Sequence, residues 1–198
     1  MAKFTASTLT ESEQFAELLR QRRTHPDRQS VVDAEIYDRF LTTCAIVVVD
    51  MADFSRLTYA EGIIPTLQQI QTLRDNAIPF IQGAHGKVLK VEADNLYAVF
   101  DTVDGALDTL DALRPQLGQS NIHISVGIGY GEVLMIGDRN LFGHEMNVTS
   151  KLGEDLAGDN DILLSASAFA ALSSADRAFT RHDLEISDVT LTYYQLQQ

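Results

Sequence analysis

Residues 44–55 read CAIVVVDMADFS, and this stretch decides how the rest of the sequence is interpreted. Its apolar and mostly β-branched beginning predicts a strand that is buried on both faces. The strand ends at Asp50, directly before a predicted helix. A carboxylate in that position suits a hard cation whose phosphate ligand rests on helix N-terminal amides. The alternative is that Asp50 or Asp53 simply caps the helix.

The composition limits the kind of protein this is. The chain has 198 residues, of which 45% are apolar and 22% charged, as in folded proteins. Its net charge of −13 argues against nucleic-acid or anionic-membrane binding, because both need a basic face. An acidic protein would have to hold a polyphosphate through metal ions and backbone amides.

The expected cellular location follows from the single cysteine and from the lack of a predicted signal peptide or membrane-spanning segment. The single cysteine, Cys44, permits no disulfide framework and indicates a reducing compartment. The first fourteen residues lack the apolar stretch of a signal peptide, and no window approaches about 18 apolar residues. We therefore expect a soluble, cytoplasmic protein.

Hydrophobic periodicity predicts the order of the elements. Residues 1–43 are expected to form a helical extension, with two helices that pack on the core or on a partner chain, and residues 44–198 one domain. In that domain we expect a strand at 44–50, a helix over 54–82 split near 62–65, strands at 86–91 and 96–100, a helix at 103–117, two strands within 122–136, a helix at 145–157, a strand at 162–164, a helix at 166–172 and a hairpin at 179–196. This order favours an α+β sandwich with a ferredoxin-like (βαββαβ-type) antiparallel sheet.

Two further groups of polar residues could carry chemistry. Asp94 lies in the predicted turn between the strands at 86–91 and 96–100, and Lys90 precedes it by four residues, so both could face one cleft. The alternative is a solvated turn with a weak surface ion pair. Asn147 and Lys151 share one helix face and could point at one ligand, or they could form a plain solvent-facing strip.

Several other motifs do not support a function. Residues 127–131, GIGYG, resemble part of a dinucleotide-binding loop, but that motif must follow a strand and open a helix. Strand-type residues follow here, so a glycine-rich bend between two strands is the better interpretation. His123, His144 and His182 show no metal-ligand spacing to one another or to Cys44.

Four stretches together resemble the catalytic domain of class III adenylate/guanylate cyclases, in a small bacterial subgroup. They are VVVDMADFSRLT, with a strand and metal aspartate; GKVLKVEADNLYAVF, similar to a Lys-x-x-Gly-Asp hairpin but with Ala93 in place of glycine; ISVGIGYGEVLMIG, similar to the strands before a dimerisation arm; and LFGHEMNVTSKLGEDLA, similar to a Gly-x-x-x-Asn-x-x-Ser-Arg helix. The resemblance runs from about Cys44 to the C-terminus and implies the nucleotide cyclase type of sheet.

The resemblance implies a two-metal mechanism. Asp50 and Asp94, with the Met51 carbonyl, would bind two Mg²⁺ or Mn²⁺ ions, which activate the ribose 3′-hydroxyl and hold the triphosphate. The alkoxide would attack the α-phosphorus and release pyrophosphate. Backbone amides of the next residues would cradle the phosphates; these residues are Ala52, Asp53, Phe54 and Ser55.

The same resemblance assigns the base and the catalytic helix. Lys90 would contact the purine edge and Asn140 would stand at the position that pairs with it, which favours ATP over GTP. Asn147 would orient the ribose, and Lys151 would offset charge on the transferring phosphoryl group. Each site would be shared between two subunits of a head-to-tail homodimer that makes cyclic AMP for intracellular signalling.

Besides Ala93, three differences from this pattern bear on base choice and catalysis. Asn140 stands where adenylate cyclases have Asp or Thr, and Lys151 replaces an arginine, keeping its charge but losing its planar fork. A late phosphate-contacting lysine is replaced near Ser187–Asp188. A cyclase-fold module that binds a nucleotide without turnover, or a guanylate cyclase, is therefore the alternative. A diguanylate cyclase or polymerase-like palm lacks support, because no Gly-Gly-Asp/Glu-Glu-Phe hairpin is present.

Overall fold

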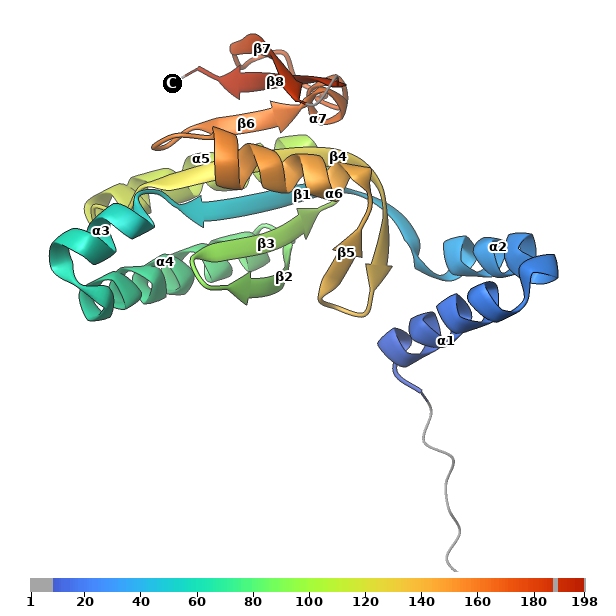
Figure 1. The fold of residues 1–198 in the computed structure, drawn as a ribbon. Coiled ribbons are helices and arrows are strands. Elements are labelled where there is room, and N and C mark those ends of the chain that lie inside the picture. Colours follow the sequence, from blue (N-terminus) through green and yellow to red (C-terminus); the bar gives the residue numbers. More distant parts are fainter. Residues whose placement is uncertain (1–8, 187–188, 198) are drawn as a thin grey trace, which may run out of the picture.

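The structure, a computed structural model, describes residues 9–186 and 189–197. Its helices are α1 (Glu11–Thr24), the short η1 (Pro26–Arg28), α2 (Gln29–Phe40), α3 (Phe54–Glu61), α4 (Ile63–Gly83), α5 (Val103–Gln119), α6 (His144–Ser150), the π-helical η2 (Lys151–Leu156) and α7 (Ala166–Ala170). Its strands are β1 (Leu41–Met51), β2 (Lys87–Glu92), β3 (Asn95–Phe100), β4 (Ile124–Ile136), β5 (Asn140–Phe142), β6 (Ile162–Ser165), β7 (Phe179–Ile186) and β8 (Val189–Leu196). The predicted α+β class is confirmed (Figure 1).

One sheet joins all the strands. Its order is β2-β3-β1-β4-β6-β8-β7, and β5 pairs only with β4. All neighbours are antiparallel except β4 and β6, which are parallel. The central β1 pairs with β3 on one side and β4 on the other, which explains its unbroken apolar sequence.

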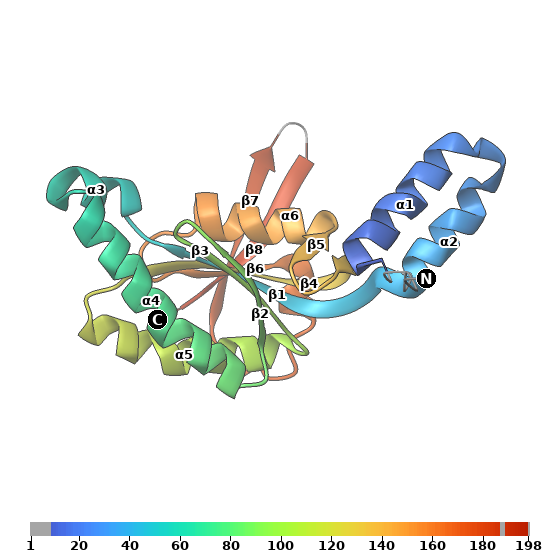
Figure 2. The ribbon, with the colours of Figure 1, turned by 90° about the horizontal axis from the view of Figure 1, so that it is seen from below.

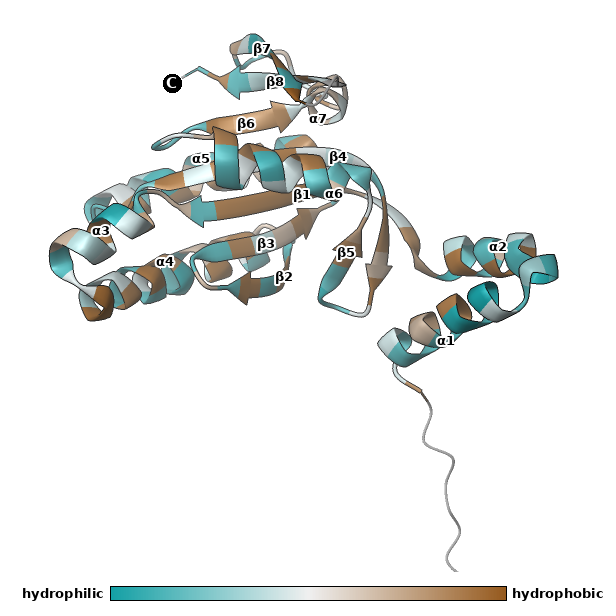
Figure 3. Ribbon diagram, viewed as in Figure 1, coloured by the Kyte–Doolittle hydropathy of each residue, from teal (hydrophilic) through white to brown (hydrophobic). Residues whose placement is uncertain are grey.

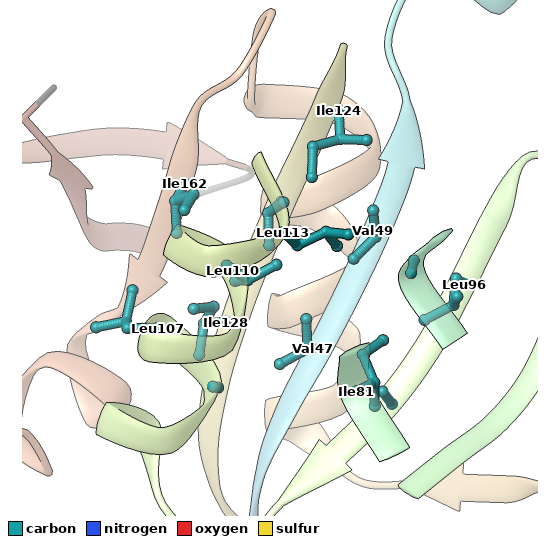
Figure 4. Packing of buried hydrophobic residues seen from close by; sticks show 14 of the residues in the cluster. Val47, Val49, Ile81, Leu96, Leu107, Leu110, Leu113, Ile124, Ile128 and Ile162 are labelled. Atoms are coloured by element: carbon teal, nitrogen blue, oxygen red, sulfur yellow. The ribbon is translucent and has the colours of Figure 1, made fainter. Parts of the chain in front are cut away.

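Helices cover both faces of this sheet. Figure 2 shows α4 and α5 on one face and α6 on the other. The main core lies between the sheet and α4 and α5, where apolar side chains from these elements interlock (Figure 4). Fully buried members include Val47, Leu110 and Ile128. The apolar colouring of β1 and β6 in Figure 3 follows their burial between these layers.

The predicted bend in residues 122–136 is wrong, because β4 is one strand over Ile124–Ile136. Its glycines instead permit a close approach of the helix that crosses it. A Cβ atom on Gly127 would lie 2.3 Å from the Thr149 carbonyl oxygen and 2.6 Å from the Gly153 amide nitrogen. A Cβ on Gly129 would overlap the Thr149 hydroxyl. The glycines therefore bring α6 and η2 against the sheet, and no turn is needed.

The first two helices form a hairpin beside the sheet (Figures 1 and 2). Arg22 holds the helices together through two bonds to Asp33, of 2.5 and 3.1 Å. A separate apolar cluster fills the hairpin: Leu18, Val32, Ile36 and Phe40, with Ile136 of β4. The strand that follows begins at Leu41, three residues before the predicted start at Cys44, because β1 extends to pair with the far end of β4. In the described part of the chain, no helix has the length and apolar character needed to cross a membrane.

Candidate active site

The register of the sheet brings Asp50 and Asp94 together. The last β1–β3 pair is Val49 with Leu96, so Asp50 lies beside the tip of the β2–β3 hairpin. Asp94 occupies that tip, and its carboxyl group is within hydrogen-bonding reach of the Asp50 carboxyl. Two residues that are 44 positions apart in sequence thus form one acidic pair at the edge of the fold.

Among the described residues, no cationic side chain forms an ion pair with either carboxyl of this pair. Burial, and then the nearby charges of Asp94 and Glu154, raise the pKa of Asp50 from 3.8 to about 7. The Met51 backbone amide donates to the Asp50 carboxylate and partly opposes this effect. Like charges that are forced together and partly buried favour either a proton or a cation between them. The pair is therefore suited to a divalent metal ion.

Two protein carboxylates are also a usual number of ligands for an ion whose other ligands are water or substrate phosphates. Within residues 9–186 and 189–197, no three His, Cys, Asp or Glu side chains form a complete metal-binding group. Mg²⁺ is commonly held by one or two carboxylates together with substrate phosphates and water. Two carboxylates are thus enough protein ligands for an ion of this kind.

A strained turn presents Asp94. Ala93, where the hairpin motif has glycine, adopts a left-handed conformation with φ of 51°. An alanine in this region costs about 1 kcal/mol relative to glycine. The guanidinium of Arg74 on α4 donates to the Ala93 carbonyl oxygen at 2.6 Å and supports the turn from below.

The loop after β1 offers fewer phosphate donors than the sequence suggested. The Ala52 amide donates to the His123 carbonyl at 3.0 Å, so Ala52 is a poor choice as a phosphate ligand. Phe54 and Ser55 begin α3, where backbone amides have no helical acceptor. Asp53 precedes the helix with φ of 64°, but its side chain does not cap it and pairs with Arg56 at 2.5 Å instead.

The two residues expected to read the base share one pocket. Lys90 and Asn140 both line a pocket of about 140 Å³ between the β2–β3 hairpin and β5. The Lys90 ammonium lies 4.2 Å from the centroid of the Tyr97 ring and pairs with Glu92 at 2.8 Å. Lys90 therefore faces this pocket.

The structure does not bring Asn147 and Lys151 to the aspartates. Asn147 is exposed on α6, and the Lys151 ammonium pairs with Asp155 at 2.6 Å. Across the described residues, no hydrogen bond or ion pair joins Asn147 or Lys151 to Asp50 or Asp94. The predicted phosphate position at Ser187–Asp188 lies outside the described residues.

Comparisons with known proteins bear on the fold. No protein-family model and no curated protein matches the sequence. Among solved structures, an adenylate/guanylate cyclase/hydrolase from Silicibacter pomeroyi has a TM-score of 0.67 at 24% identity, covering 79% of this chain and 96% of that chain. A rhodopsin-guanylyl cyclase core with converted specificity, in complex with ATPαS, has a TM-score of 0.69 at 13% identity, covering 79% of this chain and 97% of that one. The adenylyl cyclase CyaB from P. aeruginosa has a TM-score of 0.60 at 16% identity, covering 80% of this chain and 96% of that chain.

The chain has the fold of the class III nucleotide cyclase catalytic domain. The strand, hairpin and helix predicted at 44–50, 86–100 and 145–157 are present in this fold as β1, as β2 and β3, and as α6 with η2. The resemblance is thus confirmed at the level of the fold.

The sequence did not reveal two side chains of this cyclase fold near the acidic pair. Glu154 of η2 lies close enough to Asp50 to raise its pKa. The Tyr97 hydroxyl donates to the Glu154 carboxylate at 3.0 Å, and burial followed by this bond raises the pKa of Tyr97. Tyr97 therefore joins the surroundings of the acidic pair to the pocket of Lys90. The only sequence signal was the placement of a tyrosine within an otherwise apolar strand.

Proposed function

We propose that this protein is a nucleotide cyclase that converts ATP to cyclic AMP and pyrophosphate. The observation that carries the proposal is the acidic pair of Asp50 and Asp94 at the end of the central strand, which has no cationic partner in the described part of the chain. The likeness of the whole sheet to cyclase catalytic domains supports it. Magnesium or manganese ions are the cofactors that such a pair would hold.

Different residues of the chain would bind the metal ions and the phosphates of the triphosphate. Asp50, Asp94 and the Met51 carbonyl would hold two divalent ions. These ions supply the Lewis acidity that lowers the pKa of the ribose 3′-hydroxyl and balances phosphate charge. The amides of Phe54 and Ser55, free at the start of α3, would receive phosphate oxygens.

The pocket between the β2–β3 hairpin and β5 would hold the base. Lys90 can only donate a hydrogen bond, whereas Asn140 can donate and accept. A donor opposite a ring nitrogen and an acceptor opposite an amino group match the edge of adenine, which favours ATP over GTP. A neighbouring fold that binds ATPαS after conversion of its specificity shows that this architecture can be altered in base preference.

A second copy of the chain would complete the site. Asn147 and Lys151 lie apart from the aspartates of their own chain, so we infer a head-to-tail homodimer in which the helix of one copy faces the acidic pair of the other. Asn147 would orient the ribose, and Lys151 would stabilise charge on the phosphoryl group. Lys151 must then leave its ion pair with Asp155.

The test is incubation of the purified protein with ATP or GTP and Mn²⁺, followed by chromatography for the cyclic product. Asp50→Ala and Lys151→Ala should each abolish product, whereas a mixture of the two variants should regain activity, because one of the two shared sites is then intact. Failure of the mixture while the wild type is active would disprove the shared site.

A second function is favoured by one observation. Lys151 is held by Asp155 at 2.6 Å and replaces an arginine, which points to a module that binds a nucleotide without turning it over. Nucleotide binding that depends on Asp50 and Mn²⁺, without any cyclic product, would support this alternative. If the wild type makes no cyclic product and Asp50→Ala binds the nucleotide as well as the wild type does, both functions are contradicted.

A further inference from the structure

The end of β4, its turn and β5 project from the sheet as an arm, which we define as residues 133–142. Within the sheet, β5 pairs only with β4, and the pairing of β4 with β1 ends at Leu134, so the arm has no second neighbouring strand beyond that residue. A two-stranded ribbon of this kind has little independent stability in water. Its position must therefore depend on contacts with other elements.

The first helix supplies such contacts on one side of the arm. The Gly137 amide, in the turn of the arm, donates to the Glu11 carboxylate at 2.8 Å. The ring of Phe15 stacks on Phe142, with centroids 6.1 Å apart and planes at 16°. Ile136 is buried in the apolar cluster of the helical hairpin. The helix α1 thus contacts the turn and both strands of the arm.

The other side of the arm forms a wall of the base pocket. Asn140 and the neighbouring Phe142 line this pocket, opposite Lys90 and Tyr97. The tip is tied to β2 by an ion pair of 2.5 Å between Lys87 and Asp138, both of them well exposed. An exposed pair contributes little energy. The wall that carries Asn140 therefore has two apolar supports. One is the set of contacts with α1, and the other is a cluster in which Val133, Met135 and Leu141 of the arm pack with Cys44, Ile46, Leu89 and Val99 of the sheet.

We propose that α1 positions the base-binding wall, with Glu11 and Phe15 as positioning residues for the nucleotide. They act through the arm and touch no part of the acidic pair. The proposal rests on the proposed function, because it assigns the pocket of Lys90 and Asn140 to the base. It adds that the helical hairpin controls nucleotide affinity, because loss of the contacts between α1 and the arm is transmitted to the pocket.

The test uses two variants that weaken the contacts between α1 and the arm, and compares them with control variants on the same helix. Glu11→Ala removes the acceptor for Gly137, and Phe15→Ala removes the stacked ring. Glu17→Ala is the matched control for charge, because Glu17 bonds only within α1, to Arg20 and Gln21. Leu19→Ala is the matched apolar control, since Leu19 is 44% exposed. Glu11→Gln keeps an acceptor oxygen and should restore the wild-type behaviour.

Two measurements are made on the full chain of each variant. Amide hydrogen exchange over residues 137–142 reports on the arm, with residues 95–100 of β3 as the internal reference. Steady-state kinetics with ATP and Mn²⁺ give KM and kcat separately. We expect faster exchange in the arm alone and a KM raised roughly three- to ten-fold with kcat little changed, as befits loss of one positioning contact.

The outcomes separate the inference from the function on which it rests. Unchanged exchange in the arm of both variants, or a loosened arm with an unchanged KM, overturns the inference. Equal effects in Glu17→Ala and Leu19→Ala overturn it as well, because they indicate general loosening of the hairpin. If the wild type neither binds nor converts a nucleotide, the proposed function is wrong and the pocket's role with it; the exchange data then still decide whether α1 holds the arm.

Discussion

Replacing Asp50 with asparagine should stabilise the metal-free protein at pH 8 and abolish its response to divalent cations. Burial and the neighbouring Asp94 raise the pKa of Asp50 from 3.8 to about 7. A difference of that size corresponds to about 4 kcal/mol between the charged and neutral carboxyl. Relaxation and water around a partly exposed group reduce this, and we expect about 2 kcal/mol. For a chain of this length, the melting temperature should rise by about 4–8 °C.

The sign follows from proton linkage. Because the folded-state pKa of Asp50 is raised, the folded protein binds this proton more tightly than the unfolded chain does. The resulting stability is complete below about pH 4 and is lost as the pH rises towards about 7. Asparagine is neutral throughout and still offers an oxygen to the Met51 amide. The stability difference between variant and wild type should therefore grow across this window and stay constant above it.

The assay is thermal unfolding followed by circular dichroism at pH 5 and pH 8, with and without MnCl₂. Mn²⁺ should stabilise the wild type more at pH 8 than at pH 5, where protons compete, and should leave Asp50→Asn unaffected. Asp53→Asn is the control: Arg56 lowers the pKa of Asp53, so this variant should gain no stability at pH 8 and should keep the response to Mn²⁺. Equal stability of wild type and Asp50→Asn at pH 8, or an unchanged difference between the two pH values, would refute the reasoning.

Three further predictions concern packing and reactivity. Gly127→Ala should lower the free energy of unfolding by about 2–3 kcal/mol in urea titrations, because its Cβ would overlap backbone atoms, whereas Gly118→Ala, with open space around it, should gain up to about 1 kcal/mol. Cys44 should react with iodoacetamide at pH 8 only after unfolding, since burial raises its pKa to about 11; rapid labelling of the native protein, followed by mass spectrometry, would contradict this. Tyr97→Phe should cost about 1 kcal/mol in thermal unfolding through loss of its bond to Glu154, and no loss would show that this bond is replaced by water.

The sequence predicted those parts of the fold that local patterns determine. The apolar run before Asp50 is a buried central strand, and the repeats at helical spacing became α4 and α5. The split near Gly62 was also predicted, because glycine there takes φ of 91° between α3 and α4. These features depend on residues that are close together in the chain.

Features set by distant contacts were not predicted. The glycines of β4 were interpreted as a bend because the sequence does not show that Thr149 and Gly153 would pack on them. The strand β5 has three residues, too few for a period to be recognised. Glu154, whose charge raises the pKa of Asp50, lies in the π-helical η2, and the spacing of such a turn differs from that of the regular helix that was predicted.

For the candidate site, the sequence indicated which residues to consider but not how they are arranged in space. Asp50 and Asp94 were paired through the resemblance, and the register of β1 with β3 supplies the physical reason that they meet. The engagement of the Ala52 amide by His123 could not be foreseen, because it joins two loops far apart in sequence. The separation of Lys151 from the aspartates within one chain is likewise a matter of three-dimensional arrangement.

The left-handed Ala93 has a consequence for the speed of binding. The conformational cost of the turn is met during folding, with the help of Arg74, and before any ligand arrives. Asp94 is therefore already beside Asp50 in the free protein, and a cation bound as we propose would meet a preformed pair of carboxylates. The rate of cation association should then be limited by diffusion and by loss of water from the ion, without a slow ordering step of the hairpin. Solvent viscosity should change this rate only through diffusion.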